Sequence, residues 1–573
     1  MVSTSKELPI WPQPTLTEFG THTSPLLTGS DLTYSVTNVD ALPREPQAHR
    51  EEFGRRTEPA RHNDDPYAQE RVRNIFSRGI EFITSQAKFK HRSTMLRGYN
   101  EVVSPPADSH PRRHQHVSIE QLTITQPITA TFLEWYKLRV DVDGNCHIQI
   151  ASLLALNRAM ATFVQLFYGA ADSAIFCPYC PLLIEDSPQF QHRGLNIDLS
   201  RNVMLPSDIG RVIDGLWLNK FNRLHLHATD SQSWPLEIPS IPELAKKGAY
   251  HESQIWTASD LREVQKYGFE RGIEVYVEVD MPGHTASIYH SHPELIVGYK
   301  MEPVMEYALQ PPAGTLKLKS NAAREFIQRL LDDLLPRVRE YSDKFHLGGD
   351  ELNLNCYKFE EGLESNSKEV LRPLVQSFYD MCLSKLEKHD ARPMLWEEML
   401  LEWDINFPSS TIFQAWRSQE SLGKIVERGH YAIFSPCHRW YLDTGLGTFM
   451  EPDPDNPDTP VKYPFEDWCP PFKNWRTVYT YDPFEGIADK DRHLLLGGEV
   501  SLWCELTDGV TVDTMVWPRA AAAAEVLWSG SGQLDESVTR RLAGMRERLV
   551  RAGIRAGMVQ TEWALRNPGS SYM

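Results

Sequence analysis

Two adjacent carboxylates, Asp350 and Glu351, have the residue types and the spacing for acid catalysis. They follow the apolar stretch 344–349, which closes on Gly348 and Gly349. An apolar run that ends on two glycines predicts a buried strand turning sharply into a loop. That loop would place both acids at the C-terminal end of one strand, where barrel enzymes have their active sites. The alternative is a solvated acidic pair at a helix N-terminus, against which the glycines argue.

The elements that must position these acids begin near residue 193. From there, short apolar runs alternate with longer amphipathic segments about eight times, which predicts an α/β fold, a (β/α)8 barrel of parallel strands. The expected strands are 195–199, 223–227, 274–279, 344–347, 393–396, 411–416, 432–435 and 494–502. The expected helices, with apolar residues at three- and four-residue spacing, are 207–220, 259–271, 322–341, 369–389 and 419–428.

The chain before this alternation has a different pattern. It contains short strand-like runs, such as 121–125 and 135–140, and one helical stretch near 157–167. We therefore expect a smaller α+β domain over residues 1–185 and the catalytic barrel over 186–573. A length of 573 residues also favours more than one domain.

Residues 41–69 are rich in Arg, Glu and Pro and lack apolar periodicity, so we expect a polar, mobile excursion there.

The net charge of -18 opposes binding to phosphate backbones and anionic membranes, so we expect no nucleic-acid or membrane partner and a neutral or weakly charged substrate. The N-terminal residues lack the apolar core of a signal peptide, and no Asn precedes a usable glycosylation signal. We expect a cytoplasmic protein, or a secreted one if a leader has been removed.

Eight cysteines are too few for a disulfide scaffold. Cys177 and Cys180 form a Cys-x-x-Cys pair, which we interpret as a loop pair, reduced or bridged, because no strand-then-helix thioredoxin pattern surrounds it. A zinc ribbon would need a second such pair.

The expected barrel strands end in polar or aromatic residues. Aliphatic or small residues would be expected there if stability alone mattered. Acids and tryptophans on one rim suit a sugar, because aromatic faces stack on pyranose rings and a carboxyl group can protonate a glycosidic oxygen. The rim residues are Asp230, Asp280, His284, Asp350, Glu351, Trp396, Trp416, Trp503 and Glu505.

Two alternatives stay open at this point. A single Trp at a strand end is more often a core residue, although three together favour a binding site. His225 and His227 point to one strand face and, with Asp230, mimic the opening of metal-dependent barrel hydrolases, which would need further ligands such as His284 or His346. A sugar-binding barrel that has lost catalysis is the other alternative, and it would require the acid to be missing.

The order of motifs carries a resemblance. Residues 193–201 (RGLNIDLSR), 229–235 (TDSQSWP), 280–284 (DMPGH) and 346–351 (HLGGDE) follow one another, and the series continues through 395–398 (LWEE), 414–417 (QAWR), 440–443 (WYLD), 498–505 (GEVSLWCE) and 517–519 (WPR). The chain resembles the β-N-acetylhexosaminidases of glycoside hydrolase family 20 from about residue 130 to 530. Its motif sequences look closest to those of fungal members.

The resemblance implies a substrate-assisted mechanism without an enzyme nucleophile, a cofactor or a metal. Glu351 would be the general acid and then the base, and Asp350 would hold the 2-acetamido group. His284, oriented by Asp230, would tune the acid. Because adjacent carboxylates disfavour double ionisation, we expect Glu351 to keep the proton beside an ionised Asp350.

The pocket is also implied by the resemblance, which places Arg193 on sugar hydroxyls, Tyr441 and Asp443 on the acetamido group, Trp396, Trp416 and Trp503 around the ring, and Glu505 on outer hydroxyls. A closed pocket implies exo action on a small oligosaccharide or glycan. Arg193 conflicts with the barrel prediction, because it precedes its strand whereas ligand-facing residues usually follow theirs.

The sequence leaves several points open. It does not separate GlcNAc from GalNAc, and a preference for sulfated or otherwise modified terminal sugars is an alternative. The long Pro-rich segment 445–475 is expected to rim the pocket or to meet a second subunit, as in a homodimer. Cys356 has no partner upstream between Asp280 and Glu351, unlike the bridged cysteine expected of secreted relatives, which agrees with a cytoplasmic setting.

Overall fold

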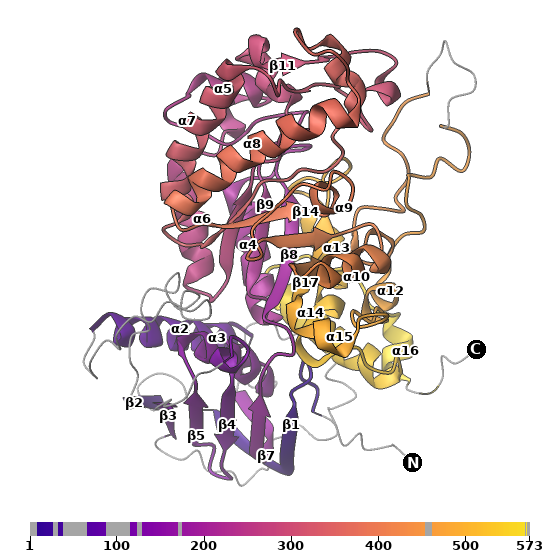
Figure 1. Cartoon of the computed structure of the whole chain (residues 1–573). Helices are drawn as coiled ribbons and strands as arrows, with labels where there is room; N and C mark the ends of the chain where they lie inside the picture. The colour runs from indigo at the N-terminus through magenta and orange to yellow at the C-terminus, as the bar shows by residue number, and fades with distance from the viewer. Residues whose placement is uncertain are drawn as a thin grey trace.

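The computed structural model describes residues 8–26, 32–37, 66–86, 115–122, 129–169, 175–452, 461–567 and 569. A mixed sheet lies at one end of the molecule and a larger barrel at the other, with helices α2 (Pro66–Gln86) and α3 (Leu153–Phe163) on the side of the sheet that faces the barrel (Figure 1). Within these residues no helix is both long enough and apolar enough to cross a membrane.

Eight parallel strands close the barrel in the order β10-β13-β14-β15-β16-β17-β8-β9, as the alternation in the sequence predicts. Each strand begins and ends within about three residues of its expected position. The strands are β8 (His192–Asp198), β9 (Arg223–His227), β10 (Glu274–Glu278), β13 (Lys344–His346), β14 (Arg392–Trp396), β15 (Ile412–Ala415), β16 (Tyr431–Phe434) and β17 (Leu495–Leu502).

Helices surround the barrel because each buries one apolar face against the strands and exposes the other. The five expected helices correspond to α4 (Pro206–Leu218), α6 (Ala258–Phe269), α7 (Asn321–Val338), α8 (Lys368–Lys388) and α10 (Gln419–Glu427). The others are α5 (Glu243–Gly248), α9 (Glu398–Leu401), α11 (Cys437–Trp440), α12 (Trp475–Tyr479), α13 (Val512–Val516), α14 (Arg519–Ser529), α15 (Glu536–Arg551) and α16 (Glu562–Arg566). A short antiparallel pair, β11 (Ile296–Val297) and β12 (Thr315–Leu316), lies in the segment between β10 and α7.

The N-terminal sheet has the order β1-β7-β4-β5-β3-β2, with β6 paired to β7. Its last strand ends at Asp186 and the first barrel strand begins at His192, so the change of architecture falls between these two residues. The strands are β1 (Leu16–Leu26), β2 (Leu32–Thr37), β3 (Gln115–Gln121), β4 (Tyr136–Val140), β5 (Cys146–Ile150), β6 (Tyr168–Gly169) and β7 (Ile175–Asp186).

Helix α2 differs from the expectation of an irregular excursion over 41–69. Residues 41–65 lie outside the described residues, but the helix begins at Pro66. Its buried side chains are Val72, Ile75, Phe76 and Ile83, which recur at helical spacing and pack in the core. This apolar stripe was the missed signal, because the polar residues just before it dominate the local composition.

Buried charge joins the two domains. Glu134, from the N-terminal domain, accepts hydrogen bonds from Arg158 at 2.5 Å and from Arg193 of β8 at 2.5 Å, and all three side chains are almost fully buried. Asn222, just before β9, also donates to Glu134 at 3.1 Å. A buried carboxylate satisfied by two guanidinium groups fixes the sheet against the N-terminal end of the barrel.

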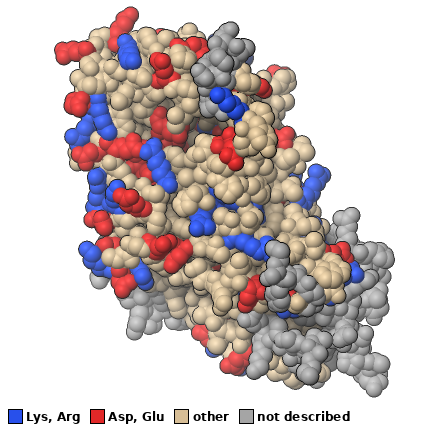
Figure 2. All heavy atoms as spheres, turned by 90° about the vertical axis from the view of Figure 1, so that its right-hand side faces the viewer, with Lys and Arg blue, Asp and Glu red and all other residues tan. Residues whose placement is uncertain are grey.

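Surface charge is mixed on the face drawn in Figure 2, where basic and acidic side chains alternate over the described atoms instead of gathering by sign. All eight cysteines are described and none is bridged. The Cys177 and Cys180 pair lies buried within strand β7, not in a loop as the sequence suggested.

Candidate active site

The loop after β13 is shaped by its two glycines. Gly348 and Gly349 have φ of 67° and 100°, a backbone region that side chains disfavour. A Cβ on Gly348 would lie 1.8 Å from Oδ1 of Asp280, and the Gly349 N–H donates to that same oxygen at 2.7 Å. The close approach of this backbone to Asp280 turns Asp350 and Glu351 into the C-terminal mouth of the barrel, as predicted.

His284 connects the acids at this mouth. Its Nδ1 lies 3.0 Å from Oδ1 of Asp230, and its Nε2 lies 3.3 Å from Oε2 of Glu351 and 3.7 Å from Oδ2 of Asp350. Burial disfavours the charged ring, but the carboxylates of Asp230, Asp350 and Asp280 outweigh it and raise the pKa of His284 well above its ordinary value. The structure therefore places the His284 ring between the other three candidate catalytic residues that the sequence selected, Asp230, Asp350 and Glu351.

Asp230 anchors this imidazolium. Its carboxylate is buried and lies 2.7 Å from Arg201 and 2.9 Å from Nε2 of His227. Burial alone would raise the pKa of Asp230, but the charges of Arg201 and His284 hold it well below its usual range. Asp230 is therefore a permanent anion that orients His284.

Asp350 lies beside a second buried carboxyl group, that of Asp280. Burial and the charge of Asp350 raise the pKa of Asp280 well above its ordinary value. Burial, with the neighbouring Glu351, also raises the pKa of Asp350. Asp280 thus belongs to the group of interacting acids at the mouth, whereas the sequence argument on protonation considered only the adjacent pair Asp350 and Glu351. Asp280 is packed against the glycine turn, a nonlocal contact that sequence does not show.

Aromatic rings line the mouth beside these acids. Trp416 stacks on Tyr441 with centroids 6.0 Å apart, and Trp503 lies 5.9 Å from Trp396 and 6.0 Å from Tyr441. Trp396 donates from Nε1 to Glu278 at 2.7 Å. The structure therefore brings the predicted tryptophans and Tyr441 into one continuous aromatic wall, of the kind that binds the faces of a sugar ring.

A second acidic group lies at another part of this wall. Asp443 accepts a hydrogen bond from the backbone N–H of Trp503 at 3.2 Å, and burial and Glu505 raise the pKa of Asp443 well above its ordinary value. Burial also raises the pKa of Glu505, while Arg201 opposes that rise. Arg201 lies with its guanidinium carbon 5.2 Å from the Trp503 ring centroid, so these three polar groups surround one edge of the aromatic wall.

Arg193 does not reach the mouth, so its expected contact with sugar hydroxyls is corrected. It lies at the start of β8, at the opposite end of the barrel, and it is 1% exposed. Its guanidinium donates to Glu134, to the Lys220 carbonyl at 3.0 Å and to the Phe190 carbonyl at 2.8 Å. The physical reason is strand direction, because residues at the start of a parallel strand lie at the end of the barrel opposite the mouth.

Arg201 is the arginine at the mouth, and the sequence reasoning missed it. It follows β8 by three residues and is held by Asp198 at 3.2 Å and by Gln232 at 3.0 Å, besides its 2.7 Å pair with Asp230. The motif 193–201 has an arginine at each end of one strand. The rule that places ligand-facing residues after the strand would have selected Arg201.

The segment 445–475 reaches the same wall in its described part. The Trp468 ring lies edge-on to Trp416 at 5.9 Å and to Tyr441 at 6.1 Å, and it is 62% exposed. Glu351 and His284 also border a hollow, together with residues of the loop 307–315, Asn353 and Cys356. The segment therefore rims the pocket, which was one of the two expectations for it.

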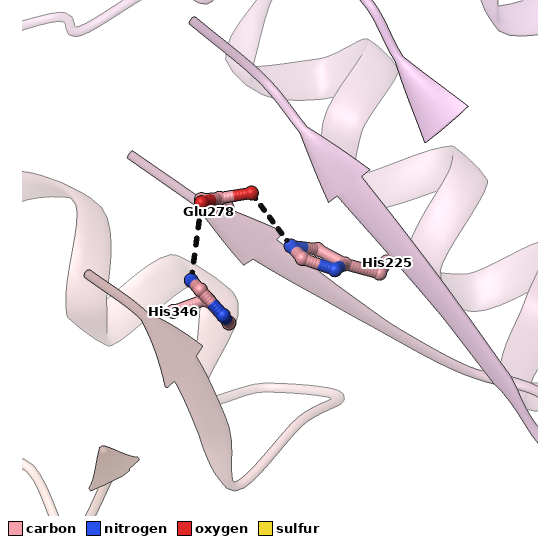
Figure 3. Close-up of side chains that lie close together, drawn as sticks. All are labelled: His225, Glu278 and His346. Atoms are coloured by element: carbon pink, nitrogen blue, oxygen red, sulfur yellow. Dashed lines mark ion pairs between the residues drawn. The ribbon is translucent and has the colours of Figure 1, made fainter. Parts of the chain in front are cut away.

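A buried histidine cluster lies deeper in the barrel. The side chains of His225 on β9, Glu278 on β10 and His346 on β13 point toward one another (Figure 3). Glu278 lies 2.9 Å from Nε2 of His225 and 3.1 Å from Nδ1 of His346. The donor set is one that a transition metal accepts, so the metal-hydrolase alternative must be weighed here.

Protonation argues against a metal on the two histidines that suggested it. His227 uses Nδ1 toward Glu278 at 2.7 Å and Nε2 toward Asp230 at 2.9 Å. Although burial opposes charge, Glu278 raises the pKa of both His225 and His227 above the ordinary value. A metal needs neutral imidazole with a free lone pair, so a cation would have to displace these ion pairs. The ion pairs of His225 and His227 form a charged support beneath the mouth, whereas burial lowers the pKa of His346.

The arrangement defines a class of protein, a barrel hydrolase with paired acids and an aromatic sugar platform. The catalytic-domain model of glycosyl hydrolase family 20 matches residues 190–531. A β-hexosaminidase of Arthroderma benhamiae is 45% identical over 473 residues, covering 79% of this chain and 78% of the relative. The β-hexosaminidase 1 of Coccidioides posadasii is 31% identical over 469 residues, covering 76% and 78%.

Solved structures share the fold. The exo β-N-acetylglucosaminidase of Vibrio harveyi in complex with N-acetylglucosamine has a TM-score of 0.70 at 20% identity and covers 97% of this chain and 78% of its own. The β-N-acetylhexosaminidase of Streptomyces coelicolor A3(2) has a TM-score of 0.66 at 21% identity, covering 96% and 97%. The chain belongs to glycosyl hydrolase family 20 and is a glycoside hydrolase of the β-hexosaminidase type, as the motifs implied.

Proposed function

We propose that the protein is an exo-acting, retaining β-N-acetylhexosaminidase that removes terminal non-reducing β-linked GlcNAc or GalNAc from chitooligosaccharides or other glycans. The observation that carries this proposal is the His284 contact to Asp350 and Glu351 beside the aromatic wall. The two acids share one mouth but have different surroundings, which suits two different roles. No metal or cofactor is part of the proposed chemistry.

Glu351 is the proposed general acid. Its side chain is 19% exposed, whereas that of Asp350 is 12% exposed, and Glu351 borders the hollow lined by the loop 307–315. A leaving sugar in that hollow would receive its proton from Glu351 as the bond to the anomeric carbon breaks. In the second half of the reaction the carboxylate takes a proton from water, and the imidazolium of His284 stabilises the anion between these steps.

Asp350 is the proposed partner of the 2-acetamido group. It would accept the amide N–H, which fixes the carbonyl oxygen of the substrate for attack on the anomeric carbon and stabilises the positive charge of the resulting oxazolinium ion. The charge of Asp350 acts on the hydroxyl of Tyr441 and helps to raise its pKa. We assign this hydroxyl as a donor to the same acetamido group. Asp350 must be ionised when the substrate binds, because it acts as an acceptor, and the raised pKa of Asp280 favours a proton on Asp280 instead.

Asp443, Glu505 and Arg201 are the proposed partners of the outer hydroxyls. Asp443 is here reassigned from the acetamido group, since it accepts a hydrogen bond from the Trp503 backbone and interacts electrostatically with Glu505. Arg201 is already paired with Asp198 and Asp230, so two carboxylates offset its positive charge at this edge of the pocket. A neutral sugar therefore fits better than a sulfated one, because a sulfate would face two carboxyl groups.

The proposal is tested with two p-nitrophenyl β-glycosides that differ only in the 2-substituent, acetamido against hydroxyl, each with and without a chelator. Cleavage of the acetamido substrate alone, unaffected by the chelator, is expected. Equal cleavage of both would contradict participation of the acetamido group, and loss of activity to the chelator would return the assignment to His225 and His227. The variant E351Q should lose activity most strongly on a sugar leaving group, which needs protonation more than a nitrophenol does.

A further inference from the structure

One buried carboxylate beneath the mouth connects two parts of the site that have different tasks. Glu278, at the end of β10, is fully buried, and His225 and His346 flank it from the strands on either side (Figure 3). Burial alone would raise the pKa of Glu278, but its histidine partners hold it well below its usual range. Glu278 is therefore a buried anion, and a buried anion must be paired on both of its oxygens.

One oxygen of Glu278 holds a ring of the aromatic wall. Its Oε1 accepts a hydrogen bond from Nε1 of Trp396 at 2.7 Å, and Trp396 is 1% exposed. An indole has a single donor, so this bond fixes which edge of the ring points down into the barrel. The rings of Trp396 and Trp503 lie 5.9 Å apart, so a rotated Trp396 would displace the rest of the wall.

The other oxygen supports the general acid. Oε2 of Glu278 lies 2.7 Å from Nδ1 of His227, and Nε2 of His227 lies 2.9 Å from Oδ2 of Asp230. Oδ1 of Asp230 lies 3.0 Å from Nδ1 of His284, and Nε2 of His284 lies 3.3 Å from Glu351. Each contact uses a different atom of its residue, so the five side chains form one unbroken chain from Glu278 to the acid.

We infer that Glu278 is a positioning residue, which holds the sugar platform Trp396 and the general acid Glu351 in a fixed relation to each other. The inference rests on the proposed function, because it concerns the same sugar and the same acid. The two oxygens of a carboxylate have a fixed separation, and here one holds the ring and the other holds the chain to the acid. Glutamine cannot replace Glu278, because its NH2 group would face either the indole N–H or the His227 ring.

A purely structural role is the alternative, and Glu499 supplies the control for it. Glu499 is also fully buried within the barrel, and it pairs with His192 at 2.7 Å and with His225 at 3.2 Å. Among the described residues, its hydrogen bonds and ion pairs do not include Trp396 or His227. E499Q therefore removes a comparable buried charge without breaking either of the two contacts that define the inference.

The first test needs no substrate. In the isotope-labelled full chain, the indole N–H signal of Trp396 is identified by nuclear magnetic resonance from its absence in W396F. We expect E278Q to move this signal upfield and to speed its exchange with solvent, whereas E499Q leaves it in place. E278D keeps the charge but withdraws it by one methylene group, so it should move the signal in the same way and serves where E278Q does not fold. An unmoved signal would overturn the inference.

Kinetics on p-nitrophenyl β-GlcNAc test both contacts. E278Q should lower kcat by roughly 10- to 100-fold, the range measured for partners that orient the ligands of a metal site. It should also raise the Ki of the product GlcNAc. The loss in kcat should not multiply with that of H284Q, and the rise in Ki should not multiply with that of W396F, because each pair acts through one series of contacts.

Losses that multiply in either cycle, as expected for E499Q, would overturn the inference and leave Glu278 a structural residue. A wild-type protein that does not cleave the acetamido substrate would instead contradict the proposed function. The resonance of Trp396 is measured without substrate, so the two failures are distinguishable.

Discussion

Nε2 of His284 lies 3.3 Å from Oε2 of Glu351. On its other side, the ring is fixed by the ionised Asp230, which also pairs with Arg201. This chain of opposite charges is buried at the mouth of the barrel, where electrostatic interactions are strong. The general acid of the proposed reaction is thus positioned by residues from the ends of three different strands.

Replacement of Asp350 should remove the acceptor for the acetamido N–H. We expect D350N to lower kcat on an acetamido substrate by roughly 10²- to 10³-fold, in the range found for the loss of one stabilising group. Steady-state kinetics on p-nitrophenyl β-GlcNAc measure this effect. D332N, at an exposed position on α7, is the matched control and should keep wild-type kcat. Similar kcat values for the two variants would remove Asp350 from the mechanism.

Replacement of His284 should move the pH dependence of activity. The pKa of His284 is raised, so the ring stays protonated until the pH rises above that value. In H284Q this positive charge beside the acids is lost, so the alkaline limb of kcat/KM should move upward while kcat falls about 10-fold or more. A pH–rate profile with an unmoved alkaline limb would show that His284 does not act on the acid.

The two arginines of the motif 193–201 should separate binding from stability. Arg201 borders the sugar pocket, so R201M is expected to raise KM, whereas Arg193 is buried on Glu134, so R193M is expected to lower the melting temperature without raising KM. Breaking a buried ion pair costs about 3–5 kcal/mol. Kinetics and thermal unfolding of the two variants check both parts. A raised KM in a stably folded R193M would restore the assignment that the sequence suggested.

The contact between the domains should weaken in acid. Arg193 and Arg158 outweigh burial and lower the pKa of Glu134 from 4.5 to about 2. Because the folded pKa is depressed, the stabilisation is complete above the unfolded value of 4.5 and is lost as the pH falls from 4.5 toward 2. At neutral pH the shift corresponds to about 3 kcal/mol.

The E134Q variant tests this linkage. It should melt at a lower temperature than the wild type at neutral pH, and the two melting temperatures should converge as the pH is lowered through that window. The control E420Q removes an exposed carboxylate, whose side chain is 76% exposed, and should leave the melting temperature unchanged. A constant difference between E134Q and the wild type at all pH values would show that ionisation of Glu134 does not stabilise the fold.

The sequence predicted the barrel because its strands and helices have different apolar periods, and it predicted the acids because strand ends share one mouth. It failed where the answer depended on contacts between distant segments. The raised pKa of Asp280 and the exchange of Arg193 for Arg201 both arise from packing. Strand direction could have identified Arg201, whereas no local pattern reveals the environment of Asp280.

The central claim, that the acetamido group of the substrate is the nucleophile, is tested most directly by a series of p-nitrophenyl glycosides with zero to three fluorines on the acetamido methyl group. Fluorine withdraws electrons from the carbonyl oxygen without a large change in shape. The account predicts that kcat/KM falls steeply with each added fluorine. A rate that does not change across the series would contradict it and would require a nucleophile from the enzyme or from water.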